Sequence, residues 1–299
     1  LDENRTLVKH GMRIMSSGLR PGLAALIEGI SLKKEELRSD QIAFGLAPHL
    51  NAAGRMGDAK VAVRLMLEKD ANRIQELTEQ LIAYNKQRKQ IQNEAYKRCV
   101  ERIDEQIADR KFLVLYTEEV HEGIAGIVAG KLKEKYERPA ILVTPSGDYV
   151  KGTGRSVPGV HLYKLLQSHE ELFLRFGGHE GACGFTMERE NLFELAEALE
   201  RDMEQMLRED PELLKQQLTA DMEIEGEQVT LELAQELELL APFGSKNPKP
   251  RFLLGQADII QPQPMGDGSH ARFQAICADG YQVECVLFSR AKDFQRQIR

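Results

Sequence analysis

A glycine-rich stretch containing one histidine, RFGGHEGACGF, occupies residues 175–185. Glycine has no Cβ, so successive backbone N–H groups can converge on an anion, and histidine adds a donor whose charge is tunable near neutral pH. Gly177, Gly178 and His179 therefore form a candidate phosphate-binding loop. The alternative is a tight turn before a buried strand, with His179 hydrogen-bonded in the core. This stretch alone does not separate the two interpretations.

Two other polar segments have a similar character. Residues 121–123 (HEG) stand between a predicted strand and a predicted helix, where free N–H groups and the helix dipole favour an anion. Residues 151–156 (KGTGRS) place two hydroxyls and a guanidinium beside two glycines, and such groups can bind phosphate oxygens. The side chains concerned are His121, Thr153, Arg155 and Ser156.

Each of these side chains also has a purely structural explanation. His121 could cap a helix, Arg155 could form a surface ion pair, and Thr153 could be an ordinary strand residue. Together, however, three glycine-flanked polar loops at strand ends in one α/β domain fit the rule that ligands bind where strands end. The sequence therefore predicts a phosphate pocket formed by the three loops.

A fourth candidate segment is the predicted turn NAAGR at residues 51–55. Its small alanines and glycine could present Arg55, and with it Asn51, to a substrate. The alternative is a tight corner between two helices. Residue types alone barely separate these two possibilities.

These segments must be positioned by three kinds of element. Residues 59 to about 109 contain no Gly or Pro and are predicted to be helical, with one apolar stripe that makes a long connecting helix. Short apolar runs at 112–116 and 140–143 flank a helical stretch, which predicts a parallel βαβ unit. Further strands are predicted at 149–153 and 184–187, so the middle domain is α/β.

The last third of the chain has a different pattern. Strand candidates at 220–224, 251–260, 271–278 and 282–288 surround one predicted helix at 231–240. Several strands, one helix and glycine-rich turns predict a small β-barrel of OB type, incomplete at its C-terminus.

Composition narrows the class of protein. With 299 residues the chain is long enough for two or three domains, and no apolar run is long enough to cross a bilayer. The net charge of −7 argues against a generally basic nucleic-acid binder, although Lys and Arg outnumber Asp and Glu in residues 1–105. Four scattered cysteines favour free thiols in a reducing cytoplasm. We interpret both ends of the chain as cut within a larger protein.

Several catalytic motifs are absent from the sequence. There is no Asp-x-Asp, Asp-His-His or His-x-x-x-Asp cluster, no Walker loop, no Gly-x-Ser-x-Gly elbow and no Rossmann fingerprint. We therefore expect no metal ligands in this chain.

Five motifs together resemble the RecJ family of exonucleases, within the DHH phosphoesterase superfamily. They are PHLNAAGRM (48–56), HEGIAGIVA (121–129), GTGRS (152–156), GGH (177–179) and APFGSKNP (241–248). The motifs run in the family's order and cover nearly the whole chain. The GGH motif indicates the wider superfamily, whereas NAAGR and PFGxxNP narrow the resemblance to RecJ.

The resemblance implies a fold and a division of the chain. The fold class is α/β, with a long connecting helix, a DHH-associated α/β domain containing a mixed sheet, and a C-terminal OB-like barrel. Residues 1–58 would be the tail of the DHH catalytic domain, 59–109 the connecting helix, 110–214 the DHH-associated domain and 215–299 the OB-like domain.

The resemblance also implies an activity: 5′-to-3′ degradation of single-stranded DNA in repair and recombination, with Mn²⁺ or Mg²⁺ held by a DHH domain that precedes these residues. Protein partners would be a single-strand-binding protein or a repair helicase, with no membrane. This chain would supply substrate binding and be inactive by itself.

The resemblance assigns roles to individual residues. Arg55 matches the arginine facing the scissile region, and Thr153 and Arg155 match the pair that receives the 5′ phosphate. His179 borders the active site, and His121 lies in the cleft. Asn51, Ser156, Gly177 and Gly178 are further substrate-binding candidates.

Two residues depart from the family pattern, and two other functions stay open. His49 stands where many relatives have Arg, and Thr153 stands where Ser is common. The alternatives are a phosphodiesterase for oligonucleotides or cyclic dinucleotides, and a non-catalytic module that binds nucleic acid or protein.

Overall fold

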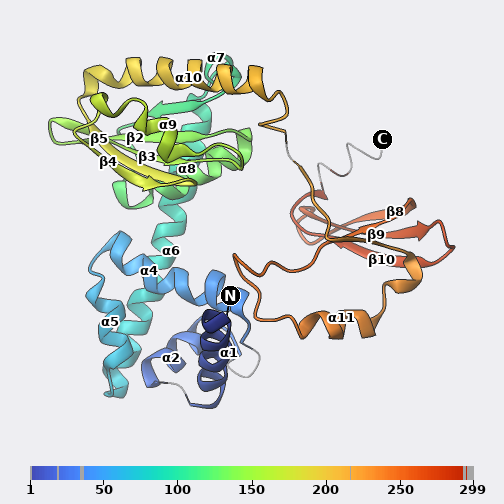
Figure 1. Ribbon diagram of the computed structural model, residues 1–299. Helices are drawn as coiled ribbons and strands as arrows, with labels where there is room; N and C mark the ends of the chain where they lie inside the picture. The colour runs from blue at the N-terminus through green and yellow to red at the C-terminus, as the bar shows by residue number, and fades with distance from the viewer. Residues whose placement is uncertain (1, 19, 34–36, 216, 292–293, 295–299) are drawn as a thin grey trace. The chain divides into compact units, whose positions relative to one another are not determined.

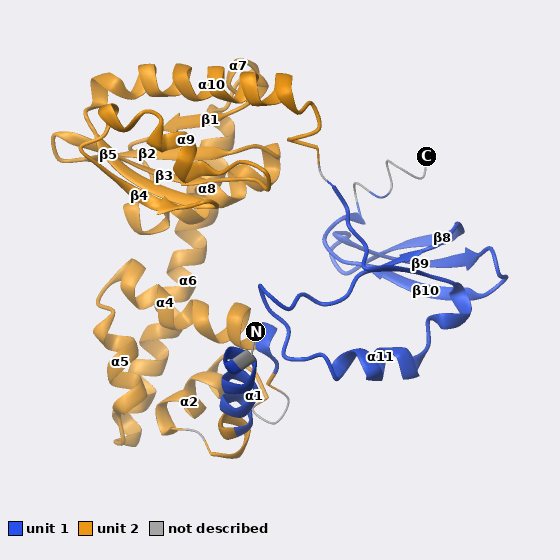
Figure 2. Cartoon of the chain, viewed as in Figure 1, with its two compact units in different colours: residues 1–13, 38–40, 217–299 blue, residues 14–37, 41–216 orange. Residues whose placement is uncertain are grey.

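The computed structural model of the protein describes all residues except 1, 19, 34–36, 216, 292–293 and 295–299. It contains two compact units, coloured separately in Figure 2: unit 1 comprises residues 1–13, 38–40 and 217–299, and unit 2 comprises residues 14–37 and 41–216. Within the described residues, no helix has both the length and the apolar composition required to span a bilayer. The division of the chain into four parts stays a prediction. The interpretation that both ends are cut concerns residues that include 1 and 295–299, which lie outside the described residues.

The first half of unit 2 is helical. Two helices are shared with unit 1: α1 (Asp2–Ser17) and the short α3 (Ser39–Gln41). The other elements of this half are α2 (Pro21–Gly29), a π-helical turn η2 (Ile42–Leu46), α4 (Ala47–Met56), α5 (Lys60–Leu67), α6 (Ala71–Arg102) and α7 (Glu105–Asp109). Leu26, Leu65 and Leu81 are fully buried and belong to one core that joins α2, α5 and α6. Ala53 of α4 belongs to the same core, which fixes α4 and α6 beside each other.

The predicted helix over residues 59–109 is in fact three helices. The first break lies between α5 and α6. Asp70 starts α6 after this break, because its side chain caps the helix by accepting the Arg73 N–H at 2.9 Å. Asp104 caps α7 in the same way through the Ile107 N–H at 2.9 Å. Aspartate favours a cap over a helix interior, which explains the breaks. The predicted apolar stripe is confirmed within α6, whose 32 residues span about 48 Å at about 1.5 Å per residue.

The second half of unit 2 is an α/β domain built on a five-stranded mixed sheet (Figure 1). The strands follow the order β1 (Leu113–Tyr116), β2 (Ala140–Ser146), β3 (Tyr149–Arg155), β5 (Ala182–Met187) and β4 (Arg175–His179). The predicted βαβ unit is confirmed, because β1 and β2 are parallel and are joined through α8 (Glu122–Tyr136). The other neighbours in the sheet are antiparallel.

The two faces of this sheet are covered differently. One face packs Val150, Phe185 and Met187 into a core with α9 (Leu162–Gln167) and α10 (Leu192–Glu209), near the short 3₁₀ turns η3 (Glu170–Leu172) and η4 (Arg189–Asn191). On the other face, Leu113 and Leu142 pack under α8 and α6. Figure 1 shows α10 along one side of the sheet and α8 on the other. Because α8 contacts β2 and β3, the face on its side over β5 and β4 is left for polar residues.

Unit 1 contains the strands of the last third of the chain. A three-stranded antiparallel sheet consists of β8 (Ala257–Met265), β9 (His270–Cys277) and β10 (Gln282–Leu287) in the order β10-β9-β8. A short parallel ladder joins β6 (Met222–Ile224) to β7 (Phe252–Leu254), and between them lie η5 (Gly226–Gln228) and α11 (Leu231–Glu238). The four predicted strand regions and the single helix are therefore present. The run 251–260 is wrong as one strand, because the chain leaves the ladder at Gly255 and starts a new strand at Ala257.

Candidate functional site

The polar residues of the α/β domain lie on one face of three adjacent strands. Side chains alternate along a strand, so Lys151, Thr153 and Arg155 of β3 share a face. The sheet register places Thr186 and Arg175 across from Lys151, Gly184 and Gly177 across from Thr153, and Ala182 and His179 across from Arg155. The face thus carries three ranks of residues, with cations at both ends and glycines in the middle.

This arrangement corrects the prediction of loops at strand ends for two of the three motifs, whereas residues 121–123 do lie after β1 at the start of α8, as predicted. KGTGR and GGH lie within β3 and β4, and a tight turn at Glu180 and Gly181 joins β4 to β5. Gly152 belongs to the apolar face, where a Cβ would lie 2.0 Å from the Phe185 ring. This glycine therefore makes room for the core, and antiparallel pairing, rather than loop geometry, brings the motifs together.

Arg155 is half-buried at the edge of α8. Its Nη1 donates to the Gly154 carbonyl oxygen at 2.8 Å, and a Cβ on Gly126 would lie 2.6 Å from its Nη2. The same Cβ would lie 3.2 Å from Cγ2 of Thr153. Gly126 of α8 therefore permits the close approach of the helix to both phosphate-binding candidates.

Arg55 approaches the same region from α4. Its Nη1 donates to the Gly123 carbonyl oxygen at 2.7 Å, in the first turn of α8. The predicted turn at residues 51–55 is wrong, because these residues lie inside α4. Asn51 is exposed one helical turn before Arg55, so both can lie on the same side of α4.

Three arginines form a positively charged cluster. Burial lowers the pKa of Arg155, and the charge of Arg55 lowers it further. Burial and then Arg55 lower the pKa of Arg88 on α6 in the same way. The charge of Arg55 thus acts on both other guanidinium groups. In the part of the chain that the structure describes, none of the three forms an ion pair with a carboxylate.

His121 and His179 each accept a hydrogen bond from a nearby backbone N–H through one ring nitrogen. Nδ1 of His121 accepts the Gly123 N–H at 3.1 Å and caps α8, while Nδ1 of His179 accepts the Gly181 N–H at 3.2 Å. A neutral ring that accepts through Nδ1 carries its proton on Nε2. Both side chains are exposed, so each Nε2–H is a donor available to a ligand.

The remaining predicted residues shape the backbone. The Ser156 hydroxyl donates to the Val160 carbonyl oxygen at 2.7 Å, and its N–H donates to the Gly181 carbonyl oxygen at 3.0 Å. Gly178 has φ 151°, and a Cβ there would lie 2.3 Å from the Ala182 carbonyl oxygen. Gly177 is exposed, and a Cβ added to it would meet no described atom within 4 Å. Ser156 and Gly178 thus hold the strands in register around the site.

Comparison with known proteins identifies the family of the two domains. Family models for a DHHA1 domain and a RecJ OB domain match residues 109–205 and 220–299. The chain is 33% identical to the single-stranded-DNA-specific exonuclease RecJ of Escherichia coli over 89% of this chain and 49% of that protein. It is 29% identical to Bacillus subtilis RecJ over 97% of this chain and 37% of that protein. The chain is RecJ-like. It spans about half or less of the length of these relatives.

A solved structure supports the same assignment. The crystal structure of RecJ from Thermus thermophilus in complex with Mn²⁺ has a TM-score of 0.79 and 30% identity, covering 94% of this chain and 41% of that one. A structure with Mg²⁺ matches equally well, with a TM-score of 0.79. The α/β domain described above is therefore a DHHA1 domain, and the C-terminal strands form a RecJ OB domain.

Those two neighbours were solved in complex with Mn²⁺ and Mg²⁺. Within the described residues of this chain, no group of three or more His, Cys, Asp or Glu side chains could hold a metal ion. The residues present therefore do not fit a divalent cation. The four cysteines are free thiols, as the sequence predicts.

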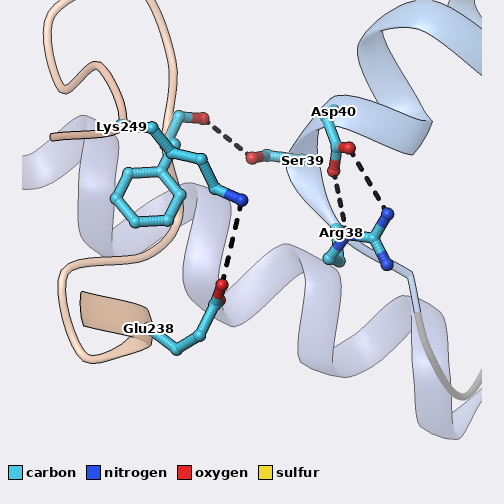
Figure 3. Close-up of polar contacts among 6 residues, drawn as sticks. Arg38, Ser39, Asp40, Glu238 and Lys249 are labelled. Carbon is cyan, nitrogen blue, oxygen red and sulfur yellow. Dashed lines mark hydrogen bonds and ion pairs between the residues drawn. The ribbon is translucent and has the colours of Figure 1, made fainter. Parts of the chain in front are cut away.

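The RecJ-like PFG segment lies in unit 1, where it contacts Ser39 (Figure 3). The Ser39 hydroxyl donates to the Phe243 carbonyl oxygen at 2.8 Å. Lys249 lies 3.9 Å from Glu238 and 5.5 Å from the centre of the Phe243 ring. Arg5 donates to the carbonyl oxygens of Leu239 and Ala241. In unit 1 this segment therefore connects the OB domain to α1 and to residues 38–40.

Sequence reasoning missed Arg88 and the network that holds it. Arg88 donates to Oδ1 of Asn85 at 3.1 Å and to Oε1 of Gln92 at 2.7 Å. The Asn85 amide in turn meets Nε2 of His49 at 2.9 Å, and Nδ1 of His49 meets the Gly45 carbonyl oxygen at 2.8 Å. The available signal was the i, i+3 and i+7 spacing of Asn85, Arg88 and Gln92 on a helix. The network fixes α6 to α4.

Proposed function

We propose that this chain is the substrate-binding part of a RecJ-like 5′-to-3′ exonuclease that acts on single-stranded DNA during repair and recombination. The polar face of the DHHA1 domain binds the 5′ end of the strand, with the terminal phosphate at Thr153 and Arg155. Resemblance to the RecJ exonucleases supports the reaction class. The arginine and hydroxyl side chains on this face support a phosphate group as the ligand.

The observation that carries this proposal is the arginine cluster without carboxylates. The charge of Arg55 acts on both Arg88 and Arg155, and in the described residues no acidic side chain pairs with any of these three arginines. Half-buried guanidinium groups that repel one another are stabilised by an anion, which would offset both their repulsion and their loss of solvent. A phosphate supplies the negative charge and a pair of oxygen atoms that a guanidinium group can bind in bidentate fashion.

Each residue then has a distinct task. Arg155 and the Thr153 hydroxyl hold the terminal phosphate, and Arg55 orients the next part of the strand from α4. His179, in the same rank as Arg155, presents its Nε2–H to the scissile phosphate, while His121 offers a donor from the cap of α8. Asn51, Ser156, Gly177 and Gly178 complete the surface around these groups.

We propose that the catalytic Mn²⁺ or Mg²⁺ is held by residues outside this chain. Divalent ions supply the activated water and charge neutralisation in phosphodiester hydrolysis. The part of the protein described here provides binding and orientation, so the 299-residue chain is expected to release no mononucleotides from 5′-phosphorylated DNA with Mn²⁺. Robust release would refute this division of roles.

The direct test is DNA binding by fluorescence anisotropy at low salt. Wild-type chain should bind a 5′-phosphorylated single strand more tightly than the same strand with a 5′ hydroxyl. Arg155→Ala should reduce that preference by about tenfold, because hydrogen bonds to a charged group contribute about 1.5–3 kcal/mol. Arg201→Ala, at an exposed position of α10, is the matched control and should keep the preference.

An unchanged preference in Arg155→Ala would favour a non-catalytic interaction module instead. Cyclic dinucleotides added as competitors separate this proposal from a dinucleotide phosphodiesterase, because they should compete poorly with a long strand. Steep loss of affinity with salt is expected, as phosphate contacts release counterions. A cytoplasmic location and a single-strand-binding protein or repair helicase as partner stay predictions.

A further inference from the structure

A second polar pocket lies on the same face of the DHHA1 sheet, beyond Thr153. Its volume is about 270 Å³. It is lined by side chains and backbone of three strands and the start of α8, including Glu122, Lys151, Thr153, Arg175 and Thr186. Gly184 also lines it and is exposed. The pocket therefore offers two cations and two hydroxyls beside one carboxylate.

The two cations of this pocket differ in their partners. Nζ of Lys151 lies 2.8 Å from a carboxylate oxygen of Glu122, with both side chains partly exposed. Arg175 is exposed, and among the described residues it forms no hydrogen bond or ion pair through its side chain. The pocket is thus positively charged as it stands, and becomes more so when Glu122 releases Lys151.

The position of the pocket decides what could reach it. Residues two apart on a strand are about 6.7 Å apart, so the Lys151 rank lies about that distance from Thr153. His179 is in the rank on the opposite side of Thr153. If the terminal 5′ phosphate binds at Thr153 and Arg155, and the strand continues past His179, this pocket lies beyond the 5′ end.

We propose that this pocket binds the outer phosphoryl groups of a 5′-triphosphorylated strand. The inference rests on the proposed function, because the innermost phosphate occupies the Thr153 and Arg155 site. Arg175 and Lys151 contact the outer phosphates, and the Thr186 hydroxyl donates to them. Glu122 competes for Lys151, so a monophosphate leaves that ion pair intact, whereas a triphosphate displaces it.

The test compares three single-stranded oligonucleotides of one sequence that carry a 5′ hydroxyl, a 5′ monophosphate or a 5′ triphosphate. Binding to the 299-residue chain is measured by fluorescence anisotropy. Wild type should bind the triphosphate about tenfold more tightly than the monophosphate, since added hydrogen bonds to charged groups outweigh the loss of the ion pair between Lys151 and Glu122. Equal affinity for the two would overturn the proposal.

Variants locate the effect. Lys151→Ala and Arg175→Ala should remove the triphosphate advantage and keep the preference for a monophosphate over a hydroxyl. Arg155→Ala should reduce that monophosphate preference, so failure of the proposed function is seen separately. Lys164→Ala, at an exposed position of α9, is the charge-matched control. If Lys151→Ala and Arg175→Ala weaken all three ligands equally, the pocket acts only by general charge and the proposal is wrong.

Two further measurements complete the test. Glu122→Gln frees Lys151 and should strengthen triphosphate binding several-fold while leaving the hydroxyl strand unchanged. Inorganic tripolyphosphate serves as a competitor, to separate a strand end from a free polyphosphate. Binding of tripolyphosphate as tight as that of the triphosphorylated strand would assign the pocket to the free anion and overturn the assignment to a strand end.

Discussion

The two faces of the DHHA1 sheet are built from alternate residues of the same strands, yet they carry different properties. Phe185 faces the core under α9 and α10 and is 4% exposed, whereas its neighbour Thr186 faces the pocket that Arg175 and Lys151 also line. On the polar side of the sheet, the helix α8 packs over β2 and β3 and does not extend over β5 and β4. Stability and ligand binding are therefore separated across one sheet, because strand side chains alternate.

The largest expected effect would test this separation on two adjacent residues. Phe185→Ala should lower the free energy of unfolding by about 3–5 kcal/mol, because it leaves a cavity against Phe173 and Met187. Thr186→Ala should lower it by less than about 1 kcal/mol, since the loss is limited to strand propensity. Urea unfolding followed by circular dichroism measures both. Similar losses for the two variants would show that the faces do not differ as described.

A second pair of neighbours sharpens the comparison on β4. Gly178→Ala should cost about 1–3 kcal/mol, because the residue has φ 151° and a Cβ would lie 2.3 Å from the Ala182 carbonyl oxygen. Gly177→Ala places its methyl in open space and should change stability by less than about 1 kcal/mol. Thermal unfolding of both proteins is the measurement. Equal stability of the two variants would contradict the register drawn for β4 and β5.

The smallest expected effect concerns the helical part of unit 2, which lacks this separation. Burial lowers the pKa of His49, and the charges of Lys89 and Arg88 lower it further, so the folded protein holds His49 neutral. The unfolded chain binds the proton more readily, so the stabilising contribution of neutral His49 is complete above about pH 6.5 and is lost as the pH falls toward its folded pKa.

Unfolding free energies at several pH values between about 7 and about 5 measure this effect, since that window brackets the ordinary histidine pKa. Wild type should lose more stability over that window than His49→Gln, which carries no titratable group at this position. Identical pH dependence in the two proteins would show that His49 does not couple protonation to folding.

Much of the architecture could be predicted from local patterns. The apolar stripe of α6, the parallel βαβ unit and the strands of the OB domain follow from periodicity and from short apolar runs. The breaks before Ala71 and before Glu105 could not be predicted from the absence of Gly and Pro. They depend on Asp70 and Asp104 accepting backbone N–H groups, which compete with a continuous helix.

The positions of the candidate site residues were predicted only in part, and their roles stay predictions. Thr153, Arg155 and His179 do share one face, but the glycines around them belong to strands, and Gly152 serves the core. Arg88 was missed because nothing in its helix shows that the charge of Arg55, from another helix, acts on it. Long-range placement of this kind depends on packing between α4, α6 and α8, which no local pattern contains.

The sequence by itself determined which residue types are available for phosphate binding, the order of the elements and the resemblance to RecJ. Those properties depend on local composition and spacing, which can be read from the sequence without a structure. Only the tertiary structure decided that antiparallel pairing of β3, β5 and β4 aligns the motifs in three ranks, and that α8 stops short of two of these strands. The register of paired strands and the extent of a covering helix are set by contacts between distant segments, because the free energy of packing belongs to the assembled core.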